Sequence, residues 1–395
     1  MRIFEVIDTY YPKIDGPINV VDNYIKNLNN IKGVKAEVFA PFKKNTKQAP
    51  YVVHRVKCLP AVEEYYMACP SLDRKIKKYL LKNKVDLIHV HSPFTLGRYF
   101  LKLGKKYGIP TVFTFHTAFK EDFERILKLK WQQKFMMNYI MKTINLAGNV
   151  WSVSNGAGEL LKSYGYTGKI NIIRNGTHFK YPNNAEDLIS LVNKKFGFSE
   201  NDIVFLSVGR IVENKRLSIA IEALKILKEK GHKFTFLIVG SGPYKNKLEK
   251  LVQSLGLENE IKLLGRIEKD DDLKALYLRA NLFLFPSTFD TASLVPIESA
   301  SMKTPTLLTK NCPTAEIIAD NHNGYLAENS SEKWAEKLEE ILSNKPKLTQ
   351  MQETCFNEVY RTWESVVEEV FENYQNIIKK HKEAQNTNIS KTQEK

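Results

Sequence analysis

The second half of the chain contains the stretch Ile203-Val-Phe-Leu-Ser-Val-Gly-Arg-Ile-Val-Glu-Asn-Lys215. Its first six residues are apolar apart from one serine, which is typical of a strand buried on both faces of a parallel sheet. Gly209 then ends the strand, and two cations, Arg210 and Lys215, precede an apolar pattern with helical spacing. The stretch therefore predicts a strand, a turn and a helix, which is the repeating unit of a doubly wound α/β domain.

The same unit recurs along the chain. Apolar runs alternate with segments of helical period in both halves of the sequence, at residues 3–7, 36–40, 87–90, 111–115, 149–153, 203–208, 235–239, 261–264, 282–285 and 306–308. Strands separated by helices indicate parallel sheets, and 395 residues are enough for two domains. We therefore predict an α/β chain with two doubly wound, Rossmann-like domains.

Composition suggests where the domains end. The polar run 181–187 is the best candidate for a linker, so we predict an N-terminal domain over residues 1–183 and a C-terminal domain over residues 190–358. Residues 359–380 are predicted to form a C-terminal helix, with apolar side chains near one face. Residues 381–395 have almost no apolar content, and we expect them to be disordered.

Several classes of protein are excluded by composition. Apolar residues make up 43% of the chain and charged residues 26%, as in globular proteins. No apolar stretch approaches the ~20 residues of a membrane-spanning helix, and Glu5 and Asp8 interrupt the segment where a signal peptide would be apolar. The four cysteines lack the spacing of a zinc site. We therefore expect a cytoplasmic protein with reduced thiols.

The net charge of +15 is unevenly distributed. Residues 1–190 carry 30 Lys and Arg against 15 Asp and Glu, whereas the rest of the chain carries 29 of each. This excess predicts that the N-terminal half meets nucleic acid, an anionic membrane surface or an acidic substrate. No nucleic-acid-binding module accompanies the basic residues, so we do not expect a nucleic-acid partner.

Polar residues follow several predicted strands, at the edge of the sheet where open α/β proteins bind ligands. Gly16 lies in the loop after the first strand and would let backbone amides approach a phosphate. His116 directly follows the strand at 111–115, and Arg210 with Lys215 could clamp a diphosphate. Each feature also has a structural interpretation, namely an ordinary βα turn, a core histidine or a solvated helix start.

A fourth loop lies in the segment Phe285–Glu298. Asp290 and Glu298 are eight positions apart and flank small residues before a predicted helix. The backbone amides near 293–295 could hold a phosphate while the carboxylates bind sugar hydroxyls.

The order of these motifs resembles that of the family 4 retaining glycosyltransferases of the GT-B fold, also called glycosyl transferases group 1. The resemblance extends over nearly the whole chain up to the last helix and includes motifs at 153–154, 174–176, 239–243 and 264–267. It implies two Rossmann-like domains that face each other across a cleft, with the C-terminal helix crossing back to the N-terminal domain.

The resemblance also implies roles for individual residues. Arg210 and Lys215 would bind the donor diphosphate, Asp290 would contact the donor sugar and His116 would lie beside the reacting sugar, so these four are the expected catalytic residues. Glu298 would hold the nucleotide ribose, and Arg266 with Ile267 would hold the base. The remaining expected substrate-binding residues are Gly16, Asn175, Gly209, Ser293, Leu294 and Val295.

The sequence departs from the family pattern at three places. Asp290 stands where the family usually has Glu, Gly16-Pro17 replaces paired glycines, and Lys303-Thr304-Pro305 replaces Gly-x-Pro. The run Asp270–Asp272 could be mistaken for a metal-binding motif, but we predict that it forms the start of a helix. The resemblance implies neither a metal nor another cofactor, because the two cations take the metal's place.

The implied function is retaining transfer of a hexosyl group from a nucleotide sugar, with a UDP-sugar as the expected donor. The expected acceptor is a lipid-linked glycan or glycolipid of cell-envelope synthesis, because the cation-rich segments 74–84 and 125–137 suit an anionic membrane. We expect peripheral association with the inner face of the plasma membrane. The alternatives are a diacylglycerol glycosyltransferase, a glycosyltransferase with a soluble acceptor and a nucleotide-sugar epimerase.

Overall fold

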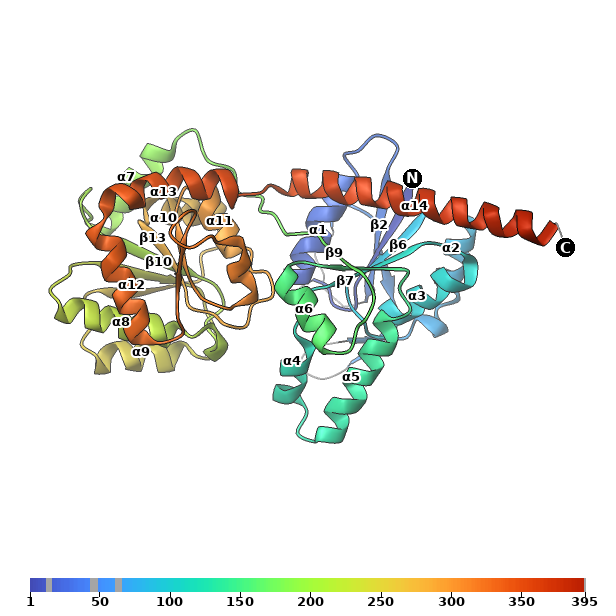
Figure 1. Cartoon of the computed structure of the whole chain (residues 1–395), viewed down its shortest axis with the longest axis horizontal. Helices are drawn as coiled ribbons and strands as arrows, with labels where there is room; N and C mark the ends of the chain where they lie inside the picture. The colour runs from blue at the N-terminus through green and yellow to red at the C-terminus, as the bar shows by residue number, and fades with distance from the viewer. Residues whose placement is uncertain (12–15, 43–48, 61–65, 394–395) are drawn as a thin grey trace. The chain divides into compact units, whose positions relative to one another are not determined.

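The computed structural model describes residues 1–11, 16–42, 49–60 and 66–393. The chain forms two α/β units (Figure 1). Met1–Asn175 and Trp363–Lys395 belong to the first unit, and Gly176–Thr362 form the second. No helix among the described residues combines the length and the apolar content needed to span a bilayer.

The first unit is built on a parallel sheet of seven strands in the order β3-β2-β1-β6-β7-β8-β9. A separate hairpin pairs β4 with β5. The strands are β1 (Arg2–Val6), β2 (Lys35–Pro41), β3 (Val53–Val56), β4 (Cys58–Pro60), β5 (Tyr66–Ala68), β6 (Leu87–Val90), β7 (Thr111–Phe115), β8 (Asn149–Ser152) and β9 (Ile170–Ile172).

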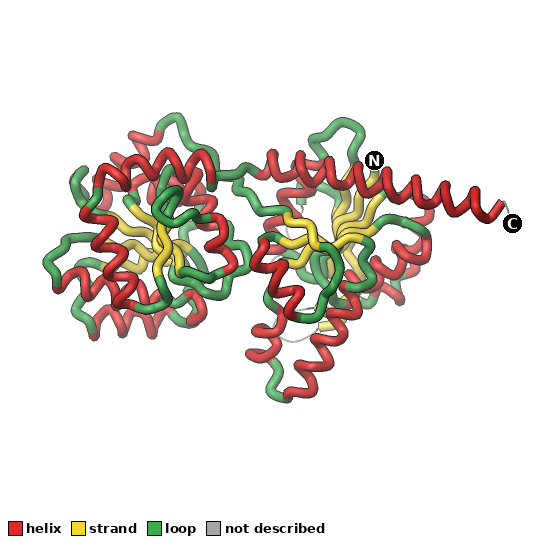
Figure 2. The backbone as a smooth tube through the Cα atoms, in the orientation of Figure 1, coloured by secondary structure: helices red, strands yellow, loops and turns green. Residues whose placement is uncertain are grey.

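Helices flank this sheet, as the tube in Figure 2 shows. On one face Phe4 packs against Phe39 and Phe39 against Phe100, and on the other Trp151 stacks on Tyr374. Both faces are buried, which explains the continuous apolar strands. The helices are α1 (Gly16–Leu28), η1 (Pro70–Leu72), α2 (Arg74–Lys82), α3 (Thr95–Tyr107), α4 (Phe119–Ile126), α5 (Lys130–Ile144), α6 (Asn155–Ser163) and α14 (Trp363–Gln393).

The second unit contains a parallel sheet of six strands in the order β12-β11-β10-β13-β14-β15. Two apolar clusters bury its faces. The elements are α7 (Ala185–Phe196), β10 (Val204–Val208), η2 (Glu213–Lys215), α8 (Leu217–Glu229), β11 (Thr235–Val239), α9 (Lys245–Ser254), β12 (Ile261–Gly265), α10 (Asp270–Arg279), β13 (Leu282–Phe285), α11 (Val295–Ser301), β14 (Thr306–Thr309), η3 (Pro313–Ile317), β15 (Tyr325–Ala327), α12 (Ser331–Ser343) and α13 (Lys345–Glu358).

Both sheets reverse their strand order once, between β1 and β6 in the first unit and between β10 and β13 in the second. Ligands of doubly wound sheets bind at this switch point, beyond the carboxyl ends of the strands. The prediction of two Rossmann-like domains is confirmed, and each of the ten predicted strands lies within two residues of an observed one. The outer strands β3, β9 and β15 were not predicted, because they are short and only partly apolar or partly exposed.

The chain passes between the units earlier than composition predicted. The division falls after Asn175 and again after Thr362, not at residue 183. The Thr177 amide donates to the Arg361 carbonyl oxygen at 2.8 Å, so the two crossing segments pair within the second unit. A Cβ on Gly176 would lie 2.8 Å from the Thr362 carbonyl group, which accounts for the glycine. The polar run at 181–187 instead marks the start of α7.

The expectation of a disordered tail was wrong for the described residues. α14 continues to Gln393 instead of ending near residue 380. The ring nitrogen Nε2 of His381 lies 2.8 Å from the Gly108 carbonyl oxygen at the end of α3, and the Gln385 side chain donates to the same oxygen at 3.1 Å. Polar contacts with the first unit therefore support a helix extension that has few apolar residues. The helix packs on this unit, as expected.

We predict that Gly240→Ala strongly destabilises the second unit. Gly240 has a φ of 143°, and an added Cβ would lie 1.8 Å from the Gly209 carbonyl oxygen, so the loops after β10 and β11 would have to separate. A loss of about 2 kcal/mol or more is expected, measured as a lower thermal midpoint. Gly16→Ala is the matched control, because a Cβ there meets nothing within 4 Å. Equal midpoints for the two variants would contradict this explanation of Gly240.

Candidate active site

Two cations lie in the turn that follows β10. Gly209 has a φ of 148°, a conformation that favours glycine, and its amide donates to the Val239 carbonyl oxygen at 2.9 Å. Arg210 follows and is exposed, while Lys215 ends the short helix η2 just before α8. The turn thus presents both cations at the carboxyl end of a central strand, as predicted.

The glycines after β11 support this turn. A Cβ on Gly242 would lie 2.1 Å from the Ile211 carbonyl oxygen. The Ile211 amide donates to the Ser241 carbonyl oxygen at 2.9 Å, so the two loops are joined backbone to backbone. Gly240 and Gly242 are therefore required by close packing of the loop that carries Arg210.

Lys215 and Asp290 form an ion pair that sequence analysis did not predict. The ammonium group of Lys215 lies 2.6 Å from Asp290 Oδ1 and 2.8 Å from Oδ2, and both side chains are partly buried. The Ser287 hydroxyl donates to Asp290 Oδ2 at 2.5 Å. The Lys215 ammonium also lies 5.2 Å from the centre of the Phe285 ring. The carboxylate therefore fixes the position of the cation before any ligand binds.

The loop around Asp290 is held by hydrogen bonds from η3. The Thr314 hydroxyl donates to the Asp290 carbonyl oxygen at 2.9 Å. The same hydroxyl oxygen accepts a hydrogen bond from the Ser293 amide at 3.2 Å. Leu294 and Val295 then begin α11. Of the three amides expected to hold phosphate, that of Ser293 is thus engaged within the protein.

Glu298 lies on α11 with its carboxylate beside the Tyr277 hydroxyl, which donates to Oε2 at 3.2 Å. Desolvation raises the pKa of the Glu298 carboxyl from 4.5 to about 7, while the hydrogen bond from Tyr277 lowers it and the charge of Asp270 raises it further. A carboxyl in this environment gains from a ligand that donates hydrogen bonds, such as the hydroxyls of a ribose.

The other expected substrate-binding residues occupy neighbouring loops or the first unit. Arg266 is exposed directly after β12, and Ile267 packs against the core of the second unit. Gly16 is the exposed first residue of α1, and the four residues before it lie outside the described part of the chain. Asn175 is buried at the end of the first unit.

His116 directly follows β7, as predicted, and is buried. Its Nε2 atom lies 3.0 Å from Nδ1 of His91, a residue that follows β6. Burial holds the pKa of His116 well below its usual value, and the neighbouring His91 acts in the same direction. His116 is therefore a neutral imidazole near neutral pH.

Sequence analysis missed the polar residues at the switch point of the first unit. Asp8 follows β1 and accepts hydrogen bonds from the amides of Leu96 at 2.6 Å and Gly97 at 3.1 Å, so it caps α3. Glu5 on β1 and His89 on β6 are buried, as is His91, which directly follows β6. The sequence pattern that could have indicated these residues is a carboxylate within one apolar strand and two histidines at the end of another.

The run Asp270–Asp272 forms the first turn of α10, as predicted. Its carboxylates make ordinary contacts at a helix start. Asp270 Oδ2 lies 3.0 Å from His178 Nε2, and Asp271 accepts from Lys274 at 3.2 Å.

Two doubly wound units, each with polar residues at its switch point, define the architecture of GT-B enzymes. Residues 189–357 match the family described as Glycosyl transferases group 1, and residues 14–180 match Glycosyltransferase Family 4. The chain belongs to this family of glycosyltransferases.

Relatives with named activities support this assignment. The chain is 25% identical over 362 residues to an alpha-monoglucosyldiacylglycerol synthase of Acholeplasma laidlawii, covering 87% of this chain and 89% of the relative. A synthase of the same name from Streptococcus pneumoniae is 24% identical, with coverages of 82% and 75%. The UDP-Gal:alpha-D-GlcNAc-diphosphoundecaprenol alpha-1,3-galactosyltransferase of Escherichia coli is 27% identical, with coverages of 71% and 72%.

Solved structures show the same fold. The sucrose-phosphate synthase of Thermosynechococcus elongatus superposes with a TM-score of 0.76 at 18% identity, covering 95% of this chain and 99% of that one. Alr3699/HepE of Anabaena, in complex with UDP, also gives 0.76 at 18% identity, with coverages of 95% and 100%.

We predict that Glu298→Gln removes a pH-dependent loss of stability. The folded carboxyl has a pKa of about 7 against an ordinary 4.5. Between these values the folded state binds more protons than the unfolded state, so wild-type stability falls as pH rises. The variant cannot ionise, so its thermal midpoint relative to wild type should rise by a few degrees from pH 5 to pH 8, since ~1 kcal/mol corresponds to about 2–4 °C for a domain of this size.

The same substitution at the exposed Glu200 is the control for this measurement. Its midpoint difference from wild type should be the same at pH 5 and pH 8. A Glu298→Gln difference that stays equally flat would show that this partly buried carboxyl is not the source of the pH dependence.

Proposed function

We propose that the protein is a retaining glycosyltransferase that moves a hexosyl group from a UDP-sugar to a lipid-borne acceptor at the cytoplasmic surface of a membrane. The observation that carries the acceptor assignment is a set of exposed aromatic side chains between lysines on α5. Relatives named as glycolipid synthases and as a diphosphoundecaprenol-dependent transferase support the same acceptor class.

Arg210 and Lys215 are the residues proposed to bind the donor diphosphate. The transferred sugar develops positive charge while the departing nucleotide becomes more negative, so fixed cations at the leaving group lower the barrier. Alr3699/HepE, which shares the fold, has been solved with UDP and with UDP-glucose. The Lys215–Asp290 pair suits this role because it holds the ammonium in place at little entropic cost.

Asp290 and Glu298 are the carboxylates proposed to bind hydroxyl groups of the nucleotide sugar.

The Lys215 ammonium has three N–H groups, and Asp290 accepts hydrogen bonds from at most two of them. One donor remains for a phosphate oxygen, so Lys215 can bridge Asp290 and the diphosphate. His116, neutral and at the end of β7, is proposed to contact the reacting sugar.

We predict that Lys215→Ala weakens UDP binding by about 10- to 100-fold, the value of a lost charge-assisted hydrogen bond. Binding of uridine, which lacks phosphate, should be unchanged. Titration calorimetry with UDP and with uridine measures both affinities. The double variant Lys215→Ala/Asp290→Asn separates loss of the cation from repulsion by an uncompensated Asp290. The assignment of Lys215 fails if uridine and UDP lose affinity equally.

The surface proposed to meet the membrane lies where α4 passes into α5, a helical hairpin of the first unit (Figure 1). Leu129, Trp131 and Phe135 are exposed by 50%, 66% and 62%. Lys128, Lys130 and Lys134 are exposed among them. We call these six residues the hairpin surface. Trp131 and Phe135 are one helical turn apart, as are Lys130 and Lys134, so aromatic groups and cations lie in adjacent rows.

The hairpin surface has the chemistry of an interfacial anchor. Aromatic rings enter the boundary between headgroups and acyl chains, and lysines are attracted to anionic lipid at ~1 kcal/mol each. Anionic lipids are characteristic of the cytoplasmic leaflet. The helix α2 of the first unit also carries exposed cations, because Ile76 and Leu80 are buried while Lys75, Lys77 and Lys78 are exposed.

We predict that phosphatidylglycerol-containing vesicles shift the tryptophan fluorescence of the protein to shorter wavelengths. The other three tryptophans, Trp151, Trp334 and Trp363, are buried, so the shift reports Trp131. Binding should fall as the Debye length shrinks from ~10 Å at 0.1 M to ~3 Å at 1 M salt. Replacing Lys128, Lys130 and Lys134 by Glu should weaken co-sedimentation by about 100-fold or more.

Two variants control this experiment. Trp131→Phe should lose the fluorescence shift but keep co-sedimentation, because the apolar contact remains. Reversing the exposed Lys250 and Lys262 in the second unit should change neither readout. The membrane proposal is contradicted if anionic vesicles at low salt leave the emission of Trp131 unchanged.

A further inference from the structure

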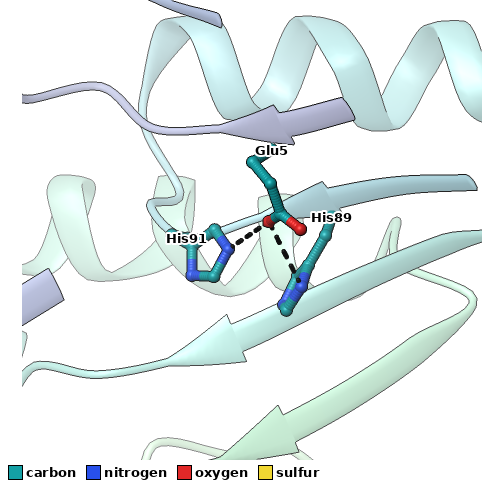
Figure 3. Close-up of side chains that lie close together, drawn as sticks. All are labelled: Glu5, His89 and His91. Carbon is teal, nitrogen blue, oxygen red and sulfur yellow. Dashed lines mark hydrogen bonds and ion pairs between the residues drawn. The ribbon is translucent and has the colours of Figure 1, made fainter. Parts of the chain in front are cut away.

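A carboxylate lies buried in the central strand of the first unit. Glu5 on β1 has no exposed surface, and its side chain points toward His89 on the neighbouring strand β6 and toward His91, which directly follows that strand (Figure 3). Glu5 Oε2 lies 2.7 Å from His91 Nε2 and 3.5 Å from His89 Nδ1. An isolated carboxylate at this depth would be strongly unfavourable, so its hydrogen-bond partners determine its state.

A line of hydrogen bonds leads from Glu5 to His116. His91 uses Nε2 toward Glu5 and Nδ1 toward His116 Nε2, which is 3.0 Å away. The rings of His91 and His116 are stacked, with centroids 5.2 Å apart and planes inclined by 20°. The line therefore runs from the interior of the sheet to the carboxyl end of β7.

Tyr374, His89 and Thr114 form the other hydrogen bonds around Glu5. The Tyr374 hydroxyl of α14 donates to Glu5 Oε1 at 3.0 Å and lies 2.5 Å from His89 Nδ1. His89 Nε2 lies 2.6 Å from the Thr114 hydroxyl. One assignment satisfies all of these contacts, with Thr114 donating to His89 Nε2 and His89 Nδ1–H donating to Tyr374. Both ring nitrogens of His89 are thus used by Tyr374 and Thr114, and His89 is not part of the line from Glu5 to His116.

Glu5, His89 and His91 also have the composition of a metal site. Every ring nitrogen of the two histidines lies within hydrogen-bonding distance of another polar atom of the protein. Hydrogen bonding alone thus accounts for the arrangement, and we assign no metal to it.

Along this line of hydrogen bonds, each protonation state of Glu5 is compatible with one tautomer of His116. A protonated Glu5 donates to His91 Nε2, so His91 donates from Nδ1 to His116 Nε2, and the proton of His116 is on Nδ1. An ionised Glu5 accepts from His91 Nε2, so His91 Nδ1 accepts from His116 Nε2, and His116 Nδ1 carries a lone pair. The two states differ by one proton. On ionisation the Glu5 proton moves to His91 Nε2, the proton on His91 Nδ1 moves to His116 Nε2, and the proton on His116 Nδ1 is released to water.

We infer that Glu5 and His91 are positioning residues that set the tautomer of His116. The inference rests on the proposed function, in which His116 meets the reacting sugar. Any group that contacts His116 Nδ1 meets a donor in one state and an acceptor in the other. This choice decides which hydroxyl or phosphate oxygen the imidazole can bind.

The electrostatics of the cluster are consistent with a switch between these states. Burial raises the pKa of Glu5 to about 8, opposed by the hydrogen bond from Tyr374. Burial lowers the pKa of His91 to about 3 and keeps His89 and His116 neutral. Among the residues that the structure describes, the ionisable groups that face Glu5, His89 or His91 are His116 after β7, Tyr24 of α1 and Tyr374 of α14. Proton loss is therefore expected to change tautomers without charging an imidazole.

Nitrogen NMR of the histidine-labelled full chain tests the inference. The His116 signals, identified by their loss in His116→Gln, should show a proton on Nδ1 at pH 6 and on Nε2 above the pKa of Glu5. Glu5→Gln should keep the proton on Nδ1 at every pH, because Tyr374 donates to the amide oxygen and the amide NH₂ then donates to His91. A His116 tautomer that is the same in wild type and variant at pH 6 and pH 9.5 overturns the inference.

Tyr374→Phe is the second variant and keeps the test decisive if Glu5→Gln does not fold. Loss of the hydrogen bond from Tyr374 removes an interaction that lowers the pKa of Glu5, so the tautomer change should persist with its midpoint at higher pH. An unmoved midpoint would contradict the inference.

In kinetics, Glu5→Gln should remove an inflection near pH 8 from the profile of kcat against pH and leave the KM for the sugar donor unchanged. The NMR result does not require turnover, so it can fail independently of the proposed function.

Discussion

Burial of the Glu5 carboxyl within a parallel sheet is the constraint on which the first unit depends. Removing such a group from water costs several kcal/mol unless hydrogen bonds compensate, and here the hydrogen bonds come from His91, directly after β6, and from Tyr374 of α14. Tyr374 lies 369 residues from Glu5 in sequence and completes its partners. The C-terminal helix therefore belongs to the N-terminal unit, because a polar group in the core of that unit requires it.

The two units divide the chemistry between them. The second unit carries no net excess of charge in its sequence half and places Arg210 and Lys215 in the turn after β10, where Asp290 holds Lys215 in position. The first unit carries the positive excess, with lysines exposed beside aromatic side chains on the hairpin surface. The proposed function would explain this difference, because it requires fixed cations for a nucleotide-sugar donor in one unit and a basic surface for a lipid-borne acceptor in the other.

Much of the fold could be predicted from the sequence, because strands buried on both faces must be apolar. The local motifs also placed Lys215, Asp290 and His116 in segments that follow strands, and Glu298 at a helix start. Pairings between distant segments could not be predicted. Lys215 and Asp290 are 75 residues apart, and Glu5 and His91 are 86 apart, so no local pattern indicates their contact. The tail was mispredicted because composition does not reveal hydrogen bonds to Gly108.

The most direct measurement of the central claim is transfer of labelled hexose from UDP-glucose or UDP-galactose in the presence of vesicles that contain anionic lipid and diacylglycerol or a lipid-linked glycan. We expect the label to appear in the organic phase only when a lipid acceptor is present, with the anomeric configuration of the donor retained in the product. Label that enters a water-soluble product, or a donor that is epimerised without any acceptor, would contradict the assignment of a lipid-directed glycosyltransferase.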